Sequence, residues 1–300
     1  SPSLYTATSV LLKKGVAIDN YETTFGIRSI NYSQEKGFEL NGKQVKFKGV
    51  CLHHDLGPLG SAVNYRATER QLEIMKSIGV NAIRTSHNPP SQEQLDLCDK
   101  MGILVQVEAF DEWAMPKVEN GYNKFWDEWH ERDLRDMIKR DRNHPSVVMW
   151  SIGNEIREQR NKKGSKVAQH LVDICHNEDP TRPVTAGFNN YPQCIKNGLA
   201  GTLDLVGFNY KPTQYNKVVK NNPSFIVYGA ETASTVSSRG VYHLPVENYD
   251  RHESLQVTSY DIVSPPWAYP PDFETYAQET MPHSLGEFVW TGFDYLGEPT

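Results

Sequence analysis

From residue 47 onward, short apolar runs alternate with segments of helical periodicity, and this alternation constrains the fold more than any other feature. The runs that read as strands are 47–53, 80–85, 103–108, 147–152, 183–187, 205–209, 225–230 and 288–293. Strands that alternate with helical crossovers are typical of a parallel sheet. Eight such units predict an α/β fold, the closed (β/α)8 or TIM barrel.

Capping signals mark several of the helices between these strands. Thr68 with Gln71 three residues later predicts the start of the first helix, and Gly79 its end. Ser91 with Gln94 predicts the start of the second helix, which we expect to end at Gly102. Further helical patterns cover about 126–142 and 163–177.

The residues before the barrel read as β-structure. Segments 4–12 and 21–30 are rich in β-branched and aromatic residues. Residues 38–40 and 45–47, joined by an Asn-Gly pair at 41–42, predict a hairpin.

Composition excludes some classes of function. The chain carries 31 basic and 37 acidic residues, a net charge of −6, which argues against a nucleic-acid partner. No apolar stretch approaches the length of a membrane span, so we expect no membrane partner. The four cysteines lack metal-binding spacing and are expected to be buried, unpaired thiols.

Polar and aromatic side chains follow almost every predicted strand. Active sites of such barrels lie where the strands end at their carboxyl side, so these positions are the first candidates. They are His53, Arg84, His87, Glu108, Asn154, Tyr210 and Trp290.

Two further carboxylates, Glu155 and Glu231, each follow an apolar strand, the fourth and the seventh. We expect these strands to face each other across the barrel and so to bring both carboxylates into one pocket. A carboxylate pair is what glycoside hydrolysis requires, because one group protonates the leaving oxygen while the other attacks or activates water. The alternative interpretation is that each glutamate only pairs with a neighbouring arginine.

Two long motifs resemble the signatures of family 2 glycoside hydrolases: residues 141–155 (DRNHPSVVMWSIGNE) and 81–89 (NAIRTSHNP). Residues 53–57 (HHDLG) and 108–113 (EAFDEW) make the β-galactosidases of that family the closest likeness.

The resemblance implies two domains. Residues 1–36 resemble the C-terminal strands of an immunoglobulin-like β-sandwich domain, with 25–28 (FGIR) as its exit. Residues 37–300 would then form the catalytic barrel, truncated after strand eight.

The resemblance also implies a retaining mechanism, with Glu155 as the general acid/base and Glu231 as the nucleophile. It places Asn154 at the sugar 2-hydroxyl, Tyr210 against the nucleophile and Arg84 as its positioning group. The resemblance further assigns substrate binding to four residues: His53, His87, Glu108 and Trp290.

Departures from the family concern the metal site. Large family members carry a magnesium-binding histidine two residues after a strand-three glutamate, but Glu112 is followed by Trp113 and Ala114. We therefore predict no catalytic metal and no cofactor. Residues 53–55 (HHD) also suggest a metal-dependent barrel hydrolase. We reject this alternative, because such an enzyme needs two histidines separated by one residue, whereas His53 and His54 are adjacent.

The expected substrate is a terminal non-reducing β-D-galactoside. A β-glucuronidase of the same family, or a catalytically incomplete carbohydrate-binding fragment, are the alternatives. Carbohydrate is the only expected partner besides a second copy of the chain in a homo-oligomer. The resemblance favours a periplasmic or secreted location over a cytoplasmic one, although the sequence itself leaves the compartment open.

Overall fold

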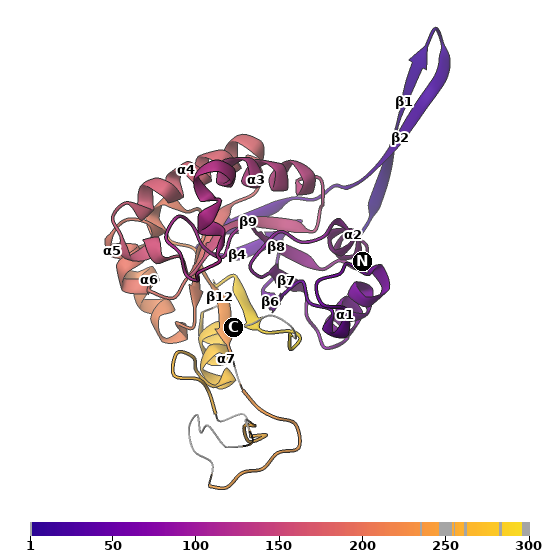
Figure 1. The fold of residues 1–300 in the computed structure, drawn as a ribbon. Helices are drawn as coiled ribbons and strands as arrows, with labels where there is room; N and C mark the ends of the chain where they lie inside the picture. Colours follow the sequence, from indigo (N-terminus) through magenta and orange to yellow (C-terminus); the bar gives the residue numbers. More distant parts are fainter. Residues whose placement is uncertain are drawn as a thin grey trace.

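The computed structural model describes residues 2–234, 236–245, 254, 256–260, 263–281 and 284–295. Eight parallel strands close into a barrel in the order β6-β7-β8-β9-β10-β11-β12-β13, with β13 pairing back onto β6 (Figure 1). The predicted TIM barrel is therefore confirmed. The strands are β6 (Phe47–Leu52), β7 (Ala82–Thr85), β8 (Leu104–Glu108), β9 (Val147–Asn154), β10 (Val184–Phe188), β11 (Val206–Asn209), β12 (Val227–Ala233) and β13 (Gly286–Trp290).

Helices cover the outside of the barrel (Figure 1). They are α1 (Tyr65–Ser77), α2 (Gln92–Met101), α3 (Trp126–Asp141), α4 (Gly164–Glu178), α5 (Tyr191–Lys196), α6 (Tyr215–Asn221) and α7 (Pro271–Thr280). Much of the long connection between β12 and α7, and the last five residues of the predicted barrel domain, lie outside the described residues.

Both caps of α2 were predicted correctly, but for α1 only the end was. The helix ends at Ser77 with Ile78 as its C-cap, and Gly79 follows with a φ of 96°. Ser91 accepts a hydrogen bond from the Gln94 backbone and Gly102 ends α2 in the left-handed region, as expected. The first helix instead starts at Tyr65, where Asn64 accepts from the Ala67 backbone. Thr68 lies inside α1 and donates its hydroxyl to the Asn64 carbonyl. Asparagine and threonine both cap helices well, so the local pattern alone does not distinguish Asn64 from Thr68.

The last barrel strand was also placed incorrectly. It runs from Gly286 to Trp290 rather than over 288–293. Gly286 has a φ of 117°, and a Cβ there would lie 2.2 Å from the Phe47 carbonyl oxygen. Glycine is thus required where β13 meets β6, although within a sequence it is typical of a turn.

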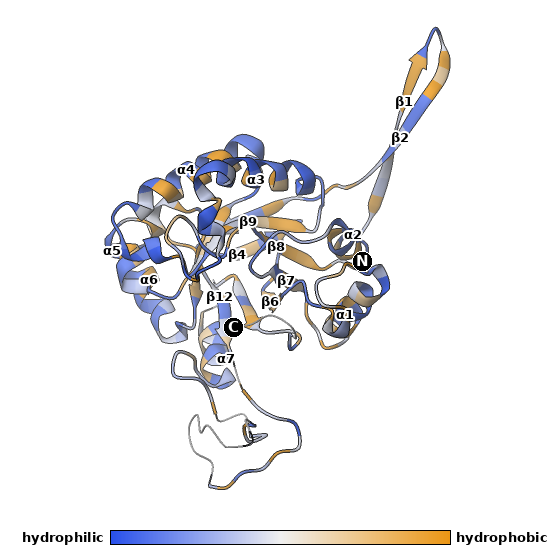
Figure 2. Ribbon diagram, viewed as in Figure 1, coloured by the Kyte–Doolittle hydropathy of each residue, from blue (hydrophilic) through white to orange (hydrophobic). Residues whose placement is uncertain are grey.

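Small antiparallel sheets precede the barrel. β1 (Leu4–Lys13) and β2 (Val16–Gly26) form a hairpin that projects away from it (Figure 1). Both strands contain apolar residues (Figure 2), among them Leu11, Val16 and Ile18, which are exposed. β3 (Ile30–Ser33), β4 (Gly37–Leu40) and β5 (Lys43–Gln44) form a second sheet. The hairpin around the Asn-Gly pair at 41–42 is present, but its second strand is Lys43–Gln44 rather than the predicted 45–47, and Phe47 already belongs to β6. β3 pairs with β4 across residue 36, and the domain boundary there stays a prediction.

The sheet of β3, β4 and β5 closes the end of the barrel where its strands begin. Phe38 of β4 packs on Phe47 at a ring distance of 4.8 Å, and Phe47 packs on Phe288 at 5.7 Å. All three side chains are buried, and the Tyr32 hydroxyl donates to the Val148 carbonyl. The base of the barrel is therefore filled by aromatic rings, which leaves the opposite rim as the place for a site.

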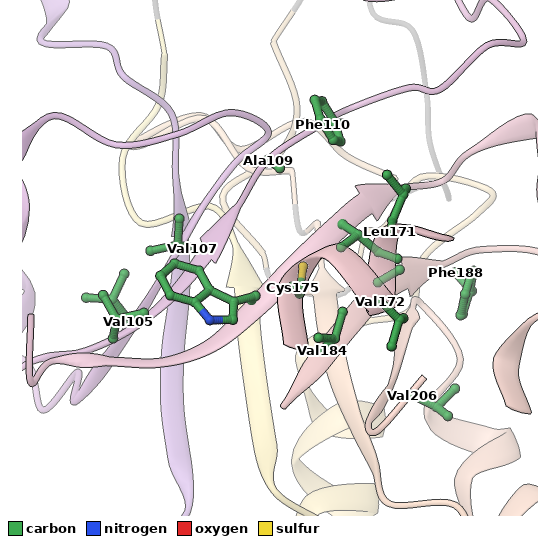
Figure 3. Packing of buried hydrophobic residues seen from close by; sticks show 14 of the residues in the cluster. Val105, Val107, Ala109, Phe110, Leu171, Val172, Cys175, Val184, Phe188 and Val206 are labelled. Carbon is green, nitrogen blue, oxygen red and sulfur yellow. The ribbon is translucent and has the colours of Figure 1, made fainter. Parts of the chain in front are cut away.

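Between the barrel and its helices lies a large apolar core. Figure 3 shows part of it, where Val105 and Val107 of β8 lie in the same layer as Leu171 and Cys175 of α4. Burial on both faces explains why β9 has no exposed residue and reads as a continuous apolar run. The four cysteines are buried and free, as predicted. None of the helices that the structure describes is long and apolar enough to cross a membrane.

Candidate active site

Arg84, the third residue of β7, connects most of the polar side chains at the barrel rim. Its guanidinium is fully buried. It donates to the Glu108 carboxylate at 2.9–3.0 Å, to Glu231 Oε2 at 2.9 Å and to Asn154 Oδ1 at 2.9 Å. Burial alone would lower the pKa of Arg84, but the charges of Glu108 and Glu231 raise it well above its usual value. One permanent cation therefore holds two carboxylates in fixed positions.

Glu108, at the end of β8, is the second buried charge of this network. Ser151 donates its hydroxyl to Glu108 Oε2 at 2.6 Å, and His87 Nδ1 lies 2.6 Å from Oε1. Burial raises the pKa of Glu108, but the Arg84 charge and the His87 hydrogen bond outweigh burial and hold that pKa well below its usual range. With its oxygens engaged in this way, Glu108 orients Arg84 and His87.

Glu231 on β12 is held from two sides. Arg84 binds Oε2, and the Tyr210 hydroxyl donates to Oε1 at 2.6 Å. Tyr210 has a φ of 57°, in the left-handed region that non-glycine residues rarely adopt. Such strain persists where the surrounding structure enforces it, commonly at functional sites. Two donors on one carboxylate fix its direction.

Glu155 directly follows β9 and also has a left-handed backbone, with a φ of 44°. The side-chain amide of Asn209 donates to Glu155 Oε1 and to Asn154 Oδ1, both at 3.0 Å. Burial raises the pKa of Glu155, and the negative charge of Glu231 raises it further. The two carboxylates therefore share one electrostatic environment but differ in their partners.

The strands that carry Glu155 and Glu231 are not related as we expected. β9 and β12 are three places apart in the ring, separated by β10 and β11, rather than opposite each other. Hydrogen bonds connect the two glutamates through Asn154 Oδ1, which accepts from Arg84, the partner of Glu231, and from Asn209, the partner of Glu155. The alternative interpretation was that each glutamate pairs only with a neighbouring arginine. Glu231 does bind Arg84, but Glu155 binds the side-chain amide of Asn209 instead.

Aromatic rings form one wall beside this network. His87 stacks on Trp290 with a ring distance of 5.4 Å and an angle of 4°, and His53 meets Trp290 edge-on at 5.0 Å. The Trp290–Thr291 peptide bond is cis. All nine sequence-predicted site residues thus lie at one rim, linked through hydrogen bonds or ring contacts.

Several members of the network were not predicted as site residues. Asn209 bridges Asn154 and Glu155, Ser151 binds Glu108, and Asp111 accepts from the Asn154 amide at 3.0 Å. Ser151 could have been found from the sequence, because it is a small polar residue inside the apolar run of β9. Asn209 ends strand six and Asp111 follows strand three, so their positions at the rim were visible although their partners were not.

Gly187 on β10 is needed for the network to close. A Cβ at this position would lie 2.8 Å from Asn209 Oδ1 and 3.3 Å from both Arg84 Nη2 and Asn154 Oδ1. We expect Gly187→Ala to lower kcat/KM roughly 100-fold, because displacements near 1 Å at a site cost about that much. The measurement is steady-state kinetics together with thermal unfolding. Gly201→Ala, where no atom lies within 4 Å of the added Cβ, is the control, and equal kinetics for both variants would contradict the prediction.

Among the described residues, the only group of three potential metal ligands is Asp96, Asp99 and His144. It lies away from the site, and its members already have partners. His144 Nδ1 is 2.7 Å from Asp99 Oδ2, and the Ser146 backbone donates to Asp99 Oδ1 at 2.9 Å. This cluster holds the turn before β9, and the absence of a catalytic metal stays a prediction.

A parallel barrel with two glutamates and an ordered polar network at its carboxyl rim defines the class of barrel glycoside hydrolases. The family model for glycosyl hydrolases family 2, TIM barrel domain, matches residues 33–261. The chain therefore belongs to glycosyl hydrolase family 2.

Relatives in this family carry different names. The chain is 40% identical to beta-galactosidase BoGH2A of Bacteroides ovatus, over all of this chain and 40% of that protein. It is 27% identical to a beta-glucuronidase of Bacteroides fragilis, over 98% of this chain and 42% of that protein. The crystal structure of a beta-glycosidase from Bacteroides vulgatus has a TM-score of 0.84 at 34% identity, over 98% of this chain and 40% of that one. The chain thus spans about two fifths of the length of these relatives.

Proposed function

We propose that this protein is a retaining β-glycosidase that hydrolyses terminal non-reducing β-D-galactosides. The observation that carries the proposal is the unequal pair of glutamates. Glu155 has a pKa raised by burial and by Glu231, whereas Glu231 accepts from Arg84 and Tyr210. Acid-assisted glycosyl transfer requires one carboxyl group that keeps its proton beside a second one that is held in a fixed direction.

In the first step, a Glu231 carboxylate oxygen attacks the anomeric carbon while Glu155 gives its proton to the departing glycosidic oxygen. The bond to the leaving group breaks and a glycosyl ester on Glu231 forms. Esterification removes the charge that raised the pKa of Glu155, so Glu155 can now accept a proton. It takes that proton from a water molecule, which attacks the anomeric carbon and releases Glu231.

The remaining predicted residues support these steps. Asn154 is placed to bind the sugar 2-hydroxyl, with its amide group oriented by Arg84 and Asn209. His53, His87 and Trp290 form the wall against which the sugar ring packs. Glu108 acts mainly as a positioning residue for Arg84 and His87, which refines the substrate-binding role that we predicted for it.

The choice of galactoside rests on the 53–57 and 108–113 motifs and on the likeness to BoGH2A. A β-glucuronidase is the second candidate, favoured by the B. fragilis relative. The test is a panel of nitrophenyl β-glycosides: galactoside, glucuronide, mannoside and glucoside. We expect hydrolysis of the galactoside alone. Reaction of the glucuronide instead would overturn the substrate, and no reaction from a folded protein would favour the catalytically incomplete fragment.

The shared environment of the glutamates predicts a specific pH dependence. Since the pKa of Glu155 is raised, its proton is retained to higher pH than usual, and kcat/KM should fall on the alkaline side as that proton is lost. Glu231→Gln removes the repelling charge, so the pKa of Glu155 should fall towards its ordinary value. Carboxyl NMR titration measures this shift directly.

Glu274→Gln provides the control for this titration. Glu274 is another buried glutamate, whose own pKa is raised to about 7 by burial, but it contributes nothing resolvable to Glu155. The Glu155 titration should be the same in this variant as in the parent. An unchanged Glu155 titration in Glu231→Gln would contradict the coupling.

A further inference from the structure

A cavity of about 900 Å³ has Glu155 in its lining but neither Arg84 nor its partners Glu108, Glu231 and Asn154. Its lining includes Glu155, Lys117, Arg157, Arg160 and Lys162. Arg157 and Arg160 belong to a short 3-10 turn that follows Glu155, and Lys162 lies between that turn and α4. The cavity is therefore built from the loop that β9 sends over the rim.

The position of Glu155 identifies what this cavity would hold. Under the proposed function, Glu155 protonates the oxygen between the terminal sugar and its leaving group. Under that function Glu231 and Trp290 would contact the terminal sugar, and neither of them lines this cavity. It consequently lies where the leaving group emerges.

The charge of this cavity is strongly positive, in a chain whose net charge is −6. Lys117 has a partner, because its ammonium group lies 2.7 Å from Asp111 Oδ1. Arg157, Arg160 and Lys162 are exposed, and none of them pairs with an acidic side chain in the described part of the chain. Glu155 is the one carboxylate in the lining.

Neighbouring elements add to this positive charge. Lys211 is close enough for the Glu155 charge to raise its pKa, although burial lowers it more. The first turn of α4 begins beside Lys162 and carries no acidic residue, so the positive end of its dipole stays uncompensated. Glu158 lies in the same turn, but its side chain is buried outside the cavity lining, and its Oε1 accepts from the Met115 backbone. Burial raises the pKa of Glu158 and so disfavours its charged form.

We propose that this cavity binds an anionic substituent, a sulfate ester or a carboxylate, on the sugar unit that leaves. The inference rests on the proposed function and refines it, because it assigns the natural substrate to charged oligosaccharides. Guanidinium groups match the planar or branched oxygens of these anions, and three unpaired cations attract them through water as well. A bound anion would also compensate the positive charges of Arg157, Arg160 and Lys162, which have no acidic partner in the described part of the chain.

The test uses three disaccharides with the same terminal sugar, which the aryl panel identifies. Their leaving units are neutral, sulfated or uronic, which distinguishes the two anionic sources. We expect one anionic substrate to have a kcat/KM roughly tenfold above that of the neutral one, since three partly exposed ion pairs sum to about that factor. The ratio should shrink in concentrated salt, because screening weakens such pairs.

A triple variant, Arg157→Gln, Arg160→Gln and Lys162→Gln, should bring the ratio close to one. The matched control removes three exposed lysines far from the rim, with Lys13→Gln and Lys14→Gln in the β1–β2 hairpin region and Lys43→Gln in β5. This control changes the net charge equally and should keep the ratio.

Each outcome separates the two proposals. If the aryl glycoside reacts but neither anionic disaccharide exceeds the neutral one, the anionic site is overturned and the glycosidase stands. Equal loss of the ratio in the triple variant and its control would also overturn the site, because the preference would then follow net charge. If no aryl glycoside reacts, the proposed function itself fails.

Discussion

Glu231→Ala is expected to lower kcat for the aryl galactoside by about 10⁴- to 10⁶-fold, which is the scale on which a nucleophile contributes. The variant lacks the oxygen that forms the glycosyl ester, and the space it leaves lies beside the Tyr210 hydroxyl and the Arg84 guanidinium. Azide fits such a space and can attack the anomeric carbon from the same side. Activity should therefore return with azide, and the product should be the α-linked azido sugar, which NMR identifies.

The stereochemistry of this product makes the experiment decisive. An α-azide shows that the missing side chain attacked the face opposite the leaving group, whereas a β-azide would assign Glu231 to the acid/base role. Glu131→Ala, an exposed position on α3, is the control and should keep parent activity. A Glu231→Ala enzyme that stays active without azide would contradict the proposed mechanism.

Arg84→Met is expected to destabilise the protein by about 3–5 kcal/mol, because removal of one partner from a buried ion pair leaves uncompensated charge. Here the removal affects Glu108, which is fully buried, and frees Glu231 on one side. Denaturant unfolding measures the loss. Activity should also fall steeply, since the direction of Glu231 is then set by Tyr210 alone.

The double variant Arg84→Met/Glu108→Gln separates stability from catalysis. Neutralising Glu108 removes the worst of the buried charge, so much of the lost free energy of unfolding should return. Activity should not, because Glu231 still lacks its guanidinium. Recovery of both together would show that Arg84 serves folding only.

The fold could be predicted from the sequence because barrel strands buried on both faces leave continuous apolar runs, as β9 does. The ends of elements were less certain. Asn64 and Thr68 are comparable caps, and Gly286 is typical of a turn until Phe47 is known to lie against it. Boundaries depend on such contacts between distant segments, which no local pattern contains.

In the candidate site, too, some residues could be predicted from the sequence and others could not. Glu155 and Glu231 were visible as polar residues that end apolar strands, and long motifs identified Asn154 and Arg84. The contacts of Asn209, Ser151 and Gly187 were not visible, because each depends on which side chain from another strand reaches it. The unpaired cations after β9 also read as an ordinary polar loop until the cavity beside Glu155 gave them a position.

The aromatic rings at the base of the barrel bear on the order in which products leave. Since Phe38, Phe47 and Phe288 fill that end, a sugar bound beside Trp290 can depart only through the rim by which it entered. Under the proposed mechanism the leaving group would lie nearer that rim and go first, which also opens the route for the hydrolytic water. Free galactose should therefore act as a competitive inhibitor, and excess leaving-group sugar should intercept the glycosyl ester and give transfer products.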